Sequence, residues 1–281
     1  MSYVKGSVLF FVLAFVVSAP SRAAVSGDAH PYLTEKFFVD VGIFFPKREL
    51  RISVEGIDGI TNQDIDFDDE LDLSKNDETV SLNFGWRIGR HWKFSAQYFR
   101  TNDSFGATLQ EDVEWGDNVF PVGGDVTGGQ DFTLVRSLIG YEFNASDKHA
   151  FGIGGGLHWL EIGVFIEGDF LLGGPGGPVV NDRESVSAKG VLPNIGAWYR
   201  YSLTQKWVLT ARYDWLSVAV GDYDGRLVNA SAGVNYQMFD HFGVGLNYNY
   251  FELDVGVSST DWVGTALTSY KGVFFYLSAY W

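Results

Sequence analysis

The segment TVSLNFGWRI, residues 79–88, decides the fold of this chain, because its apolar side chains recur at every second position. Successive side chains of a β-strand point to opposite faces, so the segment predicts a strand with one apolar and one polar face. Gly89, Arg90 and His91 follow as a turn, and residues 92–98 alternate in the same way. Two spans of about ten residues joined by a tight turn predict a β-hairpin long enough to cross a bilayer.

The same unit recurs along the chain. Further hairpins are predicted over residues 133–159, 191–215 and 228–250, and single strands over residues 37–45 and 273–281. The total is about ten strands, with eight or twelve as alternatives, and an even number places both ends on one side of a barrel. We therefore predict an all-β fold, a transmembrane antiparallel up-and-down β-barrel.

A soluble β-sandwich or lipocalin-like barrel would also accept this alternation. The aromatic residues decide between the two, because they gather at both ends of the apolar face, as two membrane interfaces require. Within each predicted hairpin a short turn joins the two strands, and long loops join one hairpin to the next. The strand ends at the short turns carry Trp86, Trp92, Phe143, Phe151, Tyr201, Trp207 and Trp281. The strand ends at the long loops carry Tyr98, Trp159, Trp215 and Tyr250.

The N-terminus and the composition set further limits. Residues 1–23 predict a secretory signal peptide, with Lys5 ahead of an apolar stretch and small residues before Ala23, which leaves residues 24–281 as a single barrel domain. The absence of cysteine excludes disulfide scaffolds, Cys-ligated zinc and Cys nucleophiles. A formal net charge of -15 repels polyphosphates, so nucleic acid is not an expected partner. No cofactor is expected.

The C-terminal strand ends on Trp281 and has apolar residues at every second position back to Val273. The chain also has a predicted signal peptide, and its hairpins have short turns at one end and long loops at the other. In these three features it resembles Gram-negative outer-membrane β-barrels, of which the small OmpA-like and OmpW-like barrels are nearest. The resemblance implies export to the bacterial outer membrane and contact with outer-membrane lipid and lipopolysaccharide. It also implies recognition of the last strand by the barrel-assembly machinery. We expect a monomer.

A ten-stranded barrel has a narrow interior, and the inward positions of this one carry charges of both signs. Isolated charges there are costly, so they are expected to pair across the lumen. The residues of this predicted network are Asp40, Arg87, Lys93, Arg136, Glu142, His158, Arg200, Arg212 and Asp214. The first hypothesis is a charge-plugged barrel with long acidic loops and a structural or surface-interaction role. A narrow channel for small solutes or amphiphiles is the alternative.

An outer-membrane lipid-modifying enzyme is the third hypothesis, although we expect no enzyme. Of the five histidines only His158 lies in a predicted strand, and no recognisable serine nucleophile motif accompanies it. A serine or acid within hydrogen-bonding reach of His158 would favour catalysis.

The sequence also contains two predicted long loops and one residue, Glu161, that does not fit the alternation of its strand. Residues 47–76 form a possible weak cation-binding loop, through Asp64, Asp66, Asp68, Asp69, Glu70 and Asp72. Residues 168–185, rich in glycine and proline, predict a mobile surface loop. Glu161 breaks the alternation of its strand, so it lies above the membrane or is turned inward by a bulge.

Overall fold

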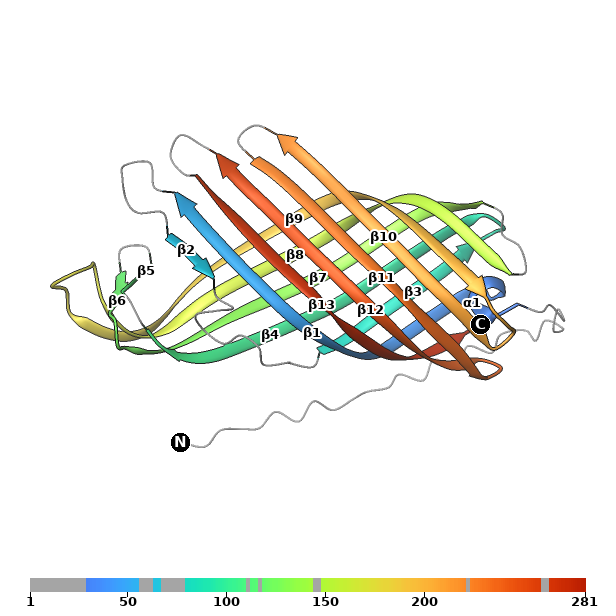
Figure 1. Ribbon diagram of the computed structural model, residues 1–281, viewed down its shortest axis with the longest axis horizontal. Coiled ribbons are helices and arrows are strands. Elements are labelled where there is room, and N and C mark those ends of the chain that lie inside the picture. Colours follow the sequence, from blue (N-terminus) through green and yellow to red (C-terminus); the bar gives the residue numbers. More distant parts are fainter. Residues whose placement is uncertain are drawn as a thin grey trace.

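The computed structural model describes residues 29–55, 63–66, 79–109, 112–115, 118–143, 148–220, 223–258 and 263–281. Ten long antiparallel strands form the tilted barrel of Figure 1. They are β1 (Phe37–Glu55), β3 (Thr79–Ile88), β4 (Trp92–Thr108), β7 (Asp125–Phe143), β8 (His149–Leu171), β9 (Val179–Ser202), β10 (Trp207–Val220), β11 (Tyr223–Phe239), β12 (Phe242–Ser258) and β13 (Val263–Tyr280). No helix among the described residues is long and apolar enough to cross a membrane.

Each long strand pairs with its neighbours in sequence, and the pairing of β1 with β13 closes the ring. The predicted ten-stranded, up-and-down barrel is therefore confirmed. Hydrogen bonds close the ring as far as residue 281. The Phe37 N–H donates to the Trp281 carbonyl at 2.7 Å, and the Trp281 N–H donates to the Phe37 carbonyl at 3.1 Å. The ring of Phe37 also stacks between Trp281 and Trp86, with centroids 5.8 and 5.9 Å away.

The predicted alternation of faces holds along the strands. Ile139 on β7 is 50% exposed on the outer surface, whereas its neighbour Leu138 is 2% exposed inside the barrel. Leu246 on β12 and Phe275 on β13 point outward in the same way. An apolar outer surface of this kind requires lipid around it, because a soluble barrel would bury its apolar face.

Several strands are longer than predicted, and the prediction of a loop over residues 168–185 is wrong. Strands β8 and β9 stay in register down to the pair Leu171 and Val179, so only residues 172–178 form the turn. Gly173, Gly174 and Gly176 have positive φ there, which glycine adopts without strain. The strands reach this turn through polar residues such as Asp169 and Asp182, so a polar sequence does not mark a loop here.

The outer end of the barrel divides into two sheets. Pairing of β9 with β10 stops at Ile195 and Trp215, and pairing of β1 with β3 stops at Phe44 and Thr79. Beyond these points β4, β7, β8 and β9 form one sheet, and β10 to β13 with β1 form the other. Figure 1 shows the two groups of strands diverging at the end opposite α1 (Pro31–Thr34). The short strands β2 (Gln63–Asp66), β5 (Val113–Trp115) and β6 (Asn118–Phe120) also lie at that end.

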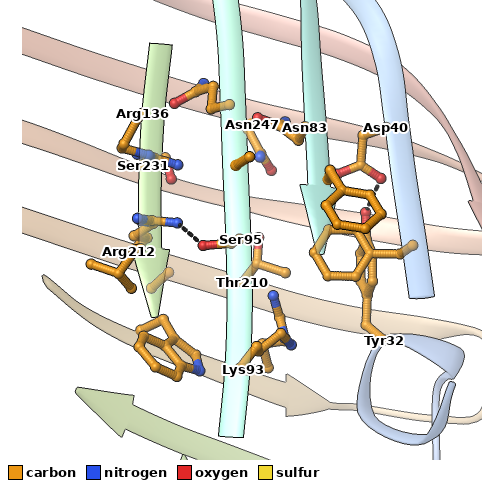
Figure 2. Close-up of a pocket in the computed structure, with 18 of the residues that line it drawn as sticks. Tyr32, Asp40, Asn83, Lys93, Ser95, Arg136, Thr210, Arg212, Ser231 and Asn247 are labelled. Atoms are coloured by element: carbon orange, nitrogen blue, oxygen red, sulfur yellow. Dashed lines mark hydrogen bonds between the residues drawn. The ribbon is translucent and has the colours of Figure 1, made fainter. Parts of the chain in front are cut away.

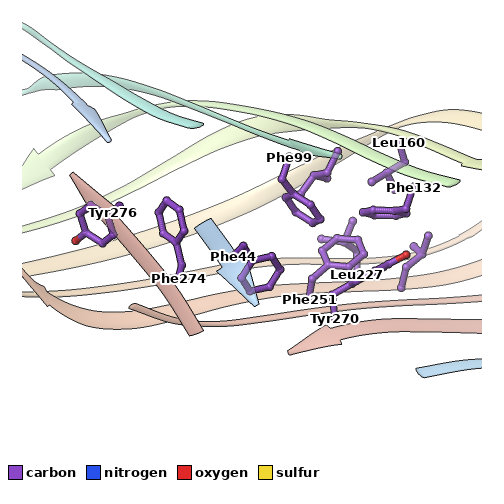
Figure 3. Close-up of a cluster of buried hydrophobic side chains, with 11 residues drawn as sticks. Phe44, Phe99, Phe132, Leu160, Leu227, Phe251, Tyr270, Phe274 and Tyr276 are labelled. Atoms are coloured by element: carbon purple, nitrogen blue, oxygen red, sulfur yellow. The ribbon is translucent and has the colours of Figure 1, made fainter. Parts of the chain in front are cut away.

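Large apolar side chains fill the lumen where the two sheets separate, as Figure 3 shows. We call this cluster the apolar layer; its buried members are Phe44, Phe99, Phe132, Leu134, Leu160, Leu227, Phe251, Leu253, Tyr270, Phe274 and Tyr276. At the other end, α1 lies inside the barrel mouth with Tyr32 and Leu33 buried against Val208 and Tyr280. The lumen is thus occupied by an apolar layer at one level and by a short helix at another.

Candidate functional site

The nine residues of the predicted lumen network all project from inward positions of the strands between α1 and the apolar layer. We call them the charged band. Six are buried at the residue level, namely Asp40, Lys93, Arg136, Glu142, His158 and Asp214. The side chains of Arg87, Arg200 and Arg212 are only 13 to 14% exposed.

Two carboxylates organise most of the charged band. Asp214 on β10 lies 2.9 Å from the Arg136 guanidinium on β7 and 3.0 Å from that of Arg212. Glu142, nearer the short turns, lies 3.5 Å from Arg87, 3.7 Å from Lys93 and 4.0 Å from Arg200. Each carboxylate therefore faces more than one cation, in a region of low dielectric where such pairing decides whether a charge is tolerated.

Asp40 forms no ion pair in the described part of the chain. Its carboxylate accepts hydrogen bonds from the Tyr32 hydroxyl at 2.5 Å and from the Ser278 hydroxyl at 2.8 Å. Burial, and secondarily the charge of Asp40, raise the pKa of Tyr32 above its ordinary value, so its hydroxyl stays a donor. Asp40 thereby ties α1 to the barrel wall.

His158 also stands apart from the ion pairs. Its Nε2 lies 3.4 Å from the Asn229 side-chain nitrogen, and Nδ1 has no hydrogen-bond partner among the described residues. The serine or acid that would favour catalysis does not hydrogen-bond this histidine in the described ranges.

A chamber of about 90 Å³ lies within the charged band (Figure 2). Four cationic side chains line it, Lys93, Arg136, Arg200 and Arg212, whereas the only carboxylate among its lining residues is Asp40. Glu142 and Asp214 are not among the lining residues. Neutral polar residues complete the wall, among them Asn83, Ser95, Thr210, Ser231, Asn247 and Asn249.

The N-terminal segment forms one boundary of this chamber through Tyr32. His30 caps α1, because its Nδ1 accepts the Tyr32 N–H at 3.2 Å, and its own N–H donates to the Ser202 hydroxyl at 3.0 Å. Burial, followed by the nearby charge of Arg200, lowers the pKa of His30 to about 3. The histidine is therefore neutral when α1 is docked.

Sequence reasoning missed Tyr32 and Trp198, although both had signals. Pro31 directly after His30 is a helix-start pattern. Trp198 has inward parity on β9, and it donates to Glu142 at 3.1 Å. A Cβ on Gly152 would lie 2.2 Å from its ring, so this glycine of β8 makes room for a lumen side chain.

The structure tests the prediction for Glu161, but it describes only part of the predicted acidic loop. The β7–β8 register runs without a break through His158 and Glu161, so the inward-bulge alternative is wrong. Glu161 faces outward and pairs with Lys189 at 2.8 Å. Within the acidic loop, Asp64 and Asp66 belong to β2, and Asp68, Asp69, Glu70 and Asp72 lie outside the described residues, as do residues 1–23. No group of side chains suited to a metal ion occurs in the described ranges.

Comparison with known proteins identifies the fold. No protein-family model and no curated protein matches the sequence. Among solved structures, the outer membrane protease OmpT from Escherichia coli matches with a TM-score of 0.55 and 8% identity, over 88% of this chain and 97% of that one. The chain has the fold of an outer-membrane β-barrel.

Two further outer-membrane structures align with weaker geometry. Ail, the attachment invasion locus protein of Yersinia pestis, matches over 86% of this chain and 98% of its own, with a TM-score of 0.32 and 12% identity. The toluene transporter TodX of Pseudomonas putida matches over 89% and 91%, with a TM-score of 0.38 and 9% identity. Similarity at these TM-scores is too low to assign any property of Ail or TodX to this chain. The likeness to OmpT establishes the fold alone.

Proposed function

We propose that this chain is an outer-membrane barrel closed to solute passage, with a structural or surface-interaction role at its outer rim. The observation that carries the proposal is the apolar layer. The ring centroid of Phe132 on β7 lies 4.6 Å from that of Tyr270 on β13 and 5.5 Å from that of Phe251 on β12, so side chains from opposite sheets meet across the lumen. A hydrated solute passing this level would lose its water without polar replacement.

The same proposal includes the route and the surroundings of the protein. Residues 1–23 direct export, the terminal strand ending at Trp281 is read by the barrel-assembly machinery, and the mature chain resides as a monomer in a Gram-negative outer membrane. The apolar outer surface, exemplified by Ile139 and Phe275, supports contact with lipid.

The surface role rests on the outer part of the sheet formed by β4, β7, β8 and β9. Exposed carboxylates cluster on the outer part of β7, β8 and β9, at Asp125, Glu167, Asp169 and Asp182. Lipopolysaccharide phosphates are also anionic, so Mg²⁺ or Ca²⁺ bridging the two is the contact proposed for this rim.

Conductance of the purified, refolded protein in a planar bilayer tests the closed lumen. We expect no steady current from the wild type, and openings from a variant carrying Phe132→Ala and Tyr270→Ala, which thins the apolar layer. A wild type that conducts steadily would replace this proposal with the narrow channel. Outer-membrane lipid analysis of a deletion strain tests the enzyme alternative.

The rim is tested by binding to lipopolysaccharide-containing and lipopolysaccharide-free vesicles at fixed Mg²⁺. A variant with Asp125→Asn, Glu167→Gln, Asp169→Asn and Asp182→Asn is expected to lose the part of binding that a chelator removes. Its fold is checked by heat-modifiable gel migration. If neither the chelator nor the four substitutions changes binding to the lipopolysaccharide-containing vesicles, the proposed rim contact is contradicted.

A further inference from the structure

We propose that the lumen chamber binds one small inorganic oxyanion of the sulfate or phosphate class. The first ground is charge. Apart from His158, the charged band contains five cations, Arg87, Lys93, Arg136, Arg200 and Arg212, but three carboxylates, Asp40, Glu142 and Asp214. This local excess of positive charge stands inside a chain whose formal net charge is -15.

The second ground is the placement of the cations. Lys93, Arg136, Arg200 and Arg212 come from β4, β7, β9 and β10 and all line one chamber, as Figure 2 shows for the three of them that it labels. The Arg136 side chain is only 8% exposed and that of Lys93 only 5%. Four cationic groups are thus held around a common space from four separate strands.

The third ground is a set of unused donors. The Nε of Arg136 and the Nη2 of Arg212 are buried and have no hydrogen-bond acceptor among the described residues. The Nη1 of Arg200 is also buried, and the Glu142 oxygen with which it forms an ion pair lies at 4.0 Å, beyond hydrogen-bonding distance. A guanidinium N–H buried without an acceptor is costly, and planar guanidinium groups match the geometry of an oxyanion. One bound oxyanion would supply acceptors to several of these donors and offset the excess charge.

The size of the chamber sets the class of ligand. The cavity volume is about 90 Å³. One water molecule needs about 15 Å³ of cavity volume measured in this way, so the chamber holds roughly six water molecules. A tetrahedral oxyanion with its remaining water fits, whereas a nucleotide or a lipid headgroup with its chains does not. Because Tyr32 bounds the chamber on one side, docking of α1 completes this part of its wall.

The test uses the full mature chain refolded into detergent micelles in sodium gluconate, whose anion is too large for the chamber. Radiolabelled sulfate or phosphate is added at constant ionic strength, and bound anion is measured by equilibrium dialysis while thermal unfolding is followed in parallel. We expect saturable binding of one anion per barrel and an unfolding temperature that rises with the logarithm of anion concentration.

Two substitutions locate the site. Arg200→Gln is expected to weaken binding at least tenfold, whereas Arg90→Gln, the same change at an exposed turn position, leaves it unchanged. Asn247→Asp places a carboxylate in the chamber wall without changing side-chain size. It is expected to abolish anion binding and to raise the unfolding temperature in gluconate, because the new carboxylate replaces the anion.

Three results would overturn the proposal. One is the absence of saturable binding to the wild type. Another is stabilisation by sodium chloride equal to that by sulfate at the same ionic strength, which indicates screening. The third is equal anion-dependent stabilisation of the wild type and the Asn247→Asp variant. None of these depends on whether the barrel conducts, so the closed lumen and the anion site are tested separately.

Discussion

Asp214 provides the counter-charge for two buried guanidinium groups, those of Arg136 at 2.9 Å and Arg212 at 3.0 Å. The substitution Asp214→Asn leaves Arg136 and Arg212 without their counter-charge, so we expect the free energy of unfolding to fall by about 3 to 5 kcal/mol. Urea unfolding in detergent micelles measures the change. The matched control is Glu161→Gln, which breaks the exposed pair with Lys189 and is expected to cost about 0 to 1 kcal/mol. Equal costs would mean that the buried pair contributes no more than a surface pair.

His30 gives the docking of α1 a dependence on pH. Its pKa is about 3 when docked, below the ordinary histidine value of 6.5, so the released segment binds the proton more readily. Docking is therefore fully stable above about pH 6.5 and weakens by up to about 1.4 kcal/mol for each pH unit below it, down to about pH 3. Protease cleavage of the N-terminal segment, followed as a function of pH, measures this release.

The variant His30→Asn separates titration from capping. Asparagine retains a side-chain acceptor for the Tyr32 N–H but does not titrate in this range. We expect its cleavage to lose most of the pH dependence between pH 3 and 6.5. A wild-type segment cleaved equally at every pH would contradict the role given to His30.

The sequence predicts which residues face the lumen better than it predicts their partners. Parity along each strand places Arg136 and Asp214 inside, because the pleat leaves no other choice. The pairing of Asp40 with Tyr32 depends instead on how a non-strand segment enters the barrel mouth, and no periodicity reports that.

The outward face of a single strand can be tested at the level of the element. Ile139 is 50% exposed on the outer surface of β7, four residues from Phe143 at the short-turn end and four from Val135, which pairs with the aromatic residues Tyr98 and Trp159. We expect Ile139→Arg to destabilise the inserted barrel by about 2 to 4 kcal/mol, because a charged side chain at mid-membrane depth must leave water. Unfolding from lipid vesicles measures it. The control Val122→Arg changes an exposed apolar residue in the turn after β6 and is expected to have little effect; equal effects would place Ile139 outside the membrane.

Strand ends were harder to predict than strand faces for a physical reason. Within the membrane lipid selects apolar residues at every second position, but beyond it both faces of a strand contact water or protein, and the alternation stops. Strands β8 and β9 therefore continue through polar residues such as Asp182 and Arg183 without a sequence signal. The division into two sheets beyond Ile195 and Trp215 arises from pairing, which a single sequence does not encode in its periodicity.

The whole molecule is held closed by its two end strands. Strands β1 and β13 pair from Phe38 with Tyr280 up to Glu55 with Val263, and beyond Phe38 the backbones of Phe37 and Trp281 exchange hydrogen bonds. A closed ring has no exposed strand edge in lipid, and it unfolds only when many backbone hydrogen bonds break together. Stability should therefore be a property of the complete ring.

We expect the mature chain to fractionate with outer membranes and to migrate differently in detergent gels before and after boiling, because the closed ring resists detergent until heated. A chain truncated before Val263 lacks β13, so β1 and β12 become unpaired edges, and we expect it to show a single band whether or not it is boiled. Its expression level, measured after boiling, controls for the amount of protein. Recovery of the wild type as a soluble periplasmic monomer, or identical migration before and after boiling, would contradict a membrane barrel closed by β1 and β13.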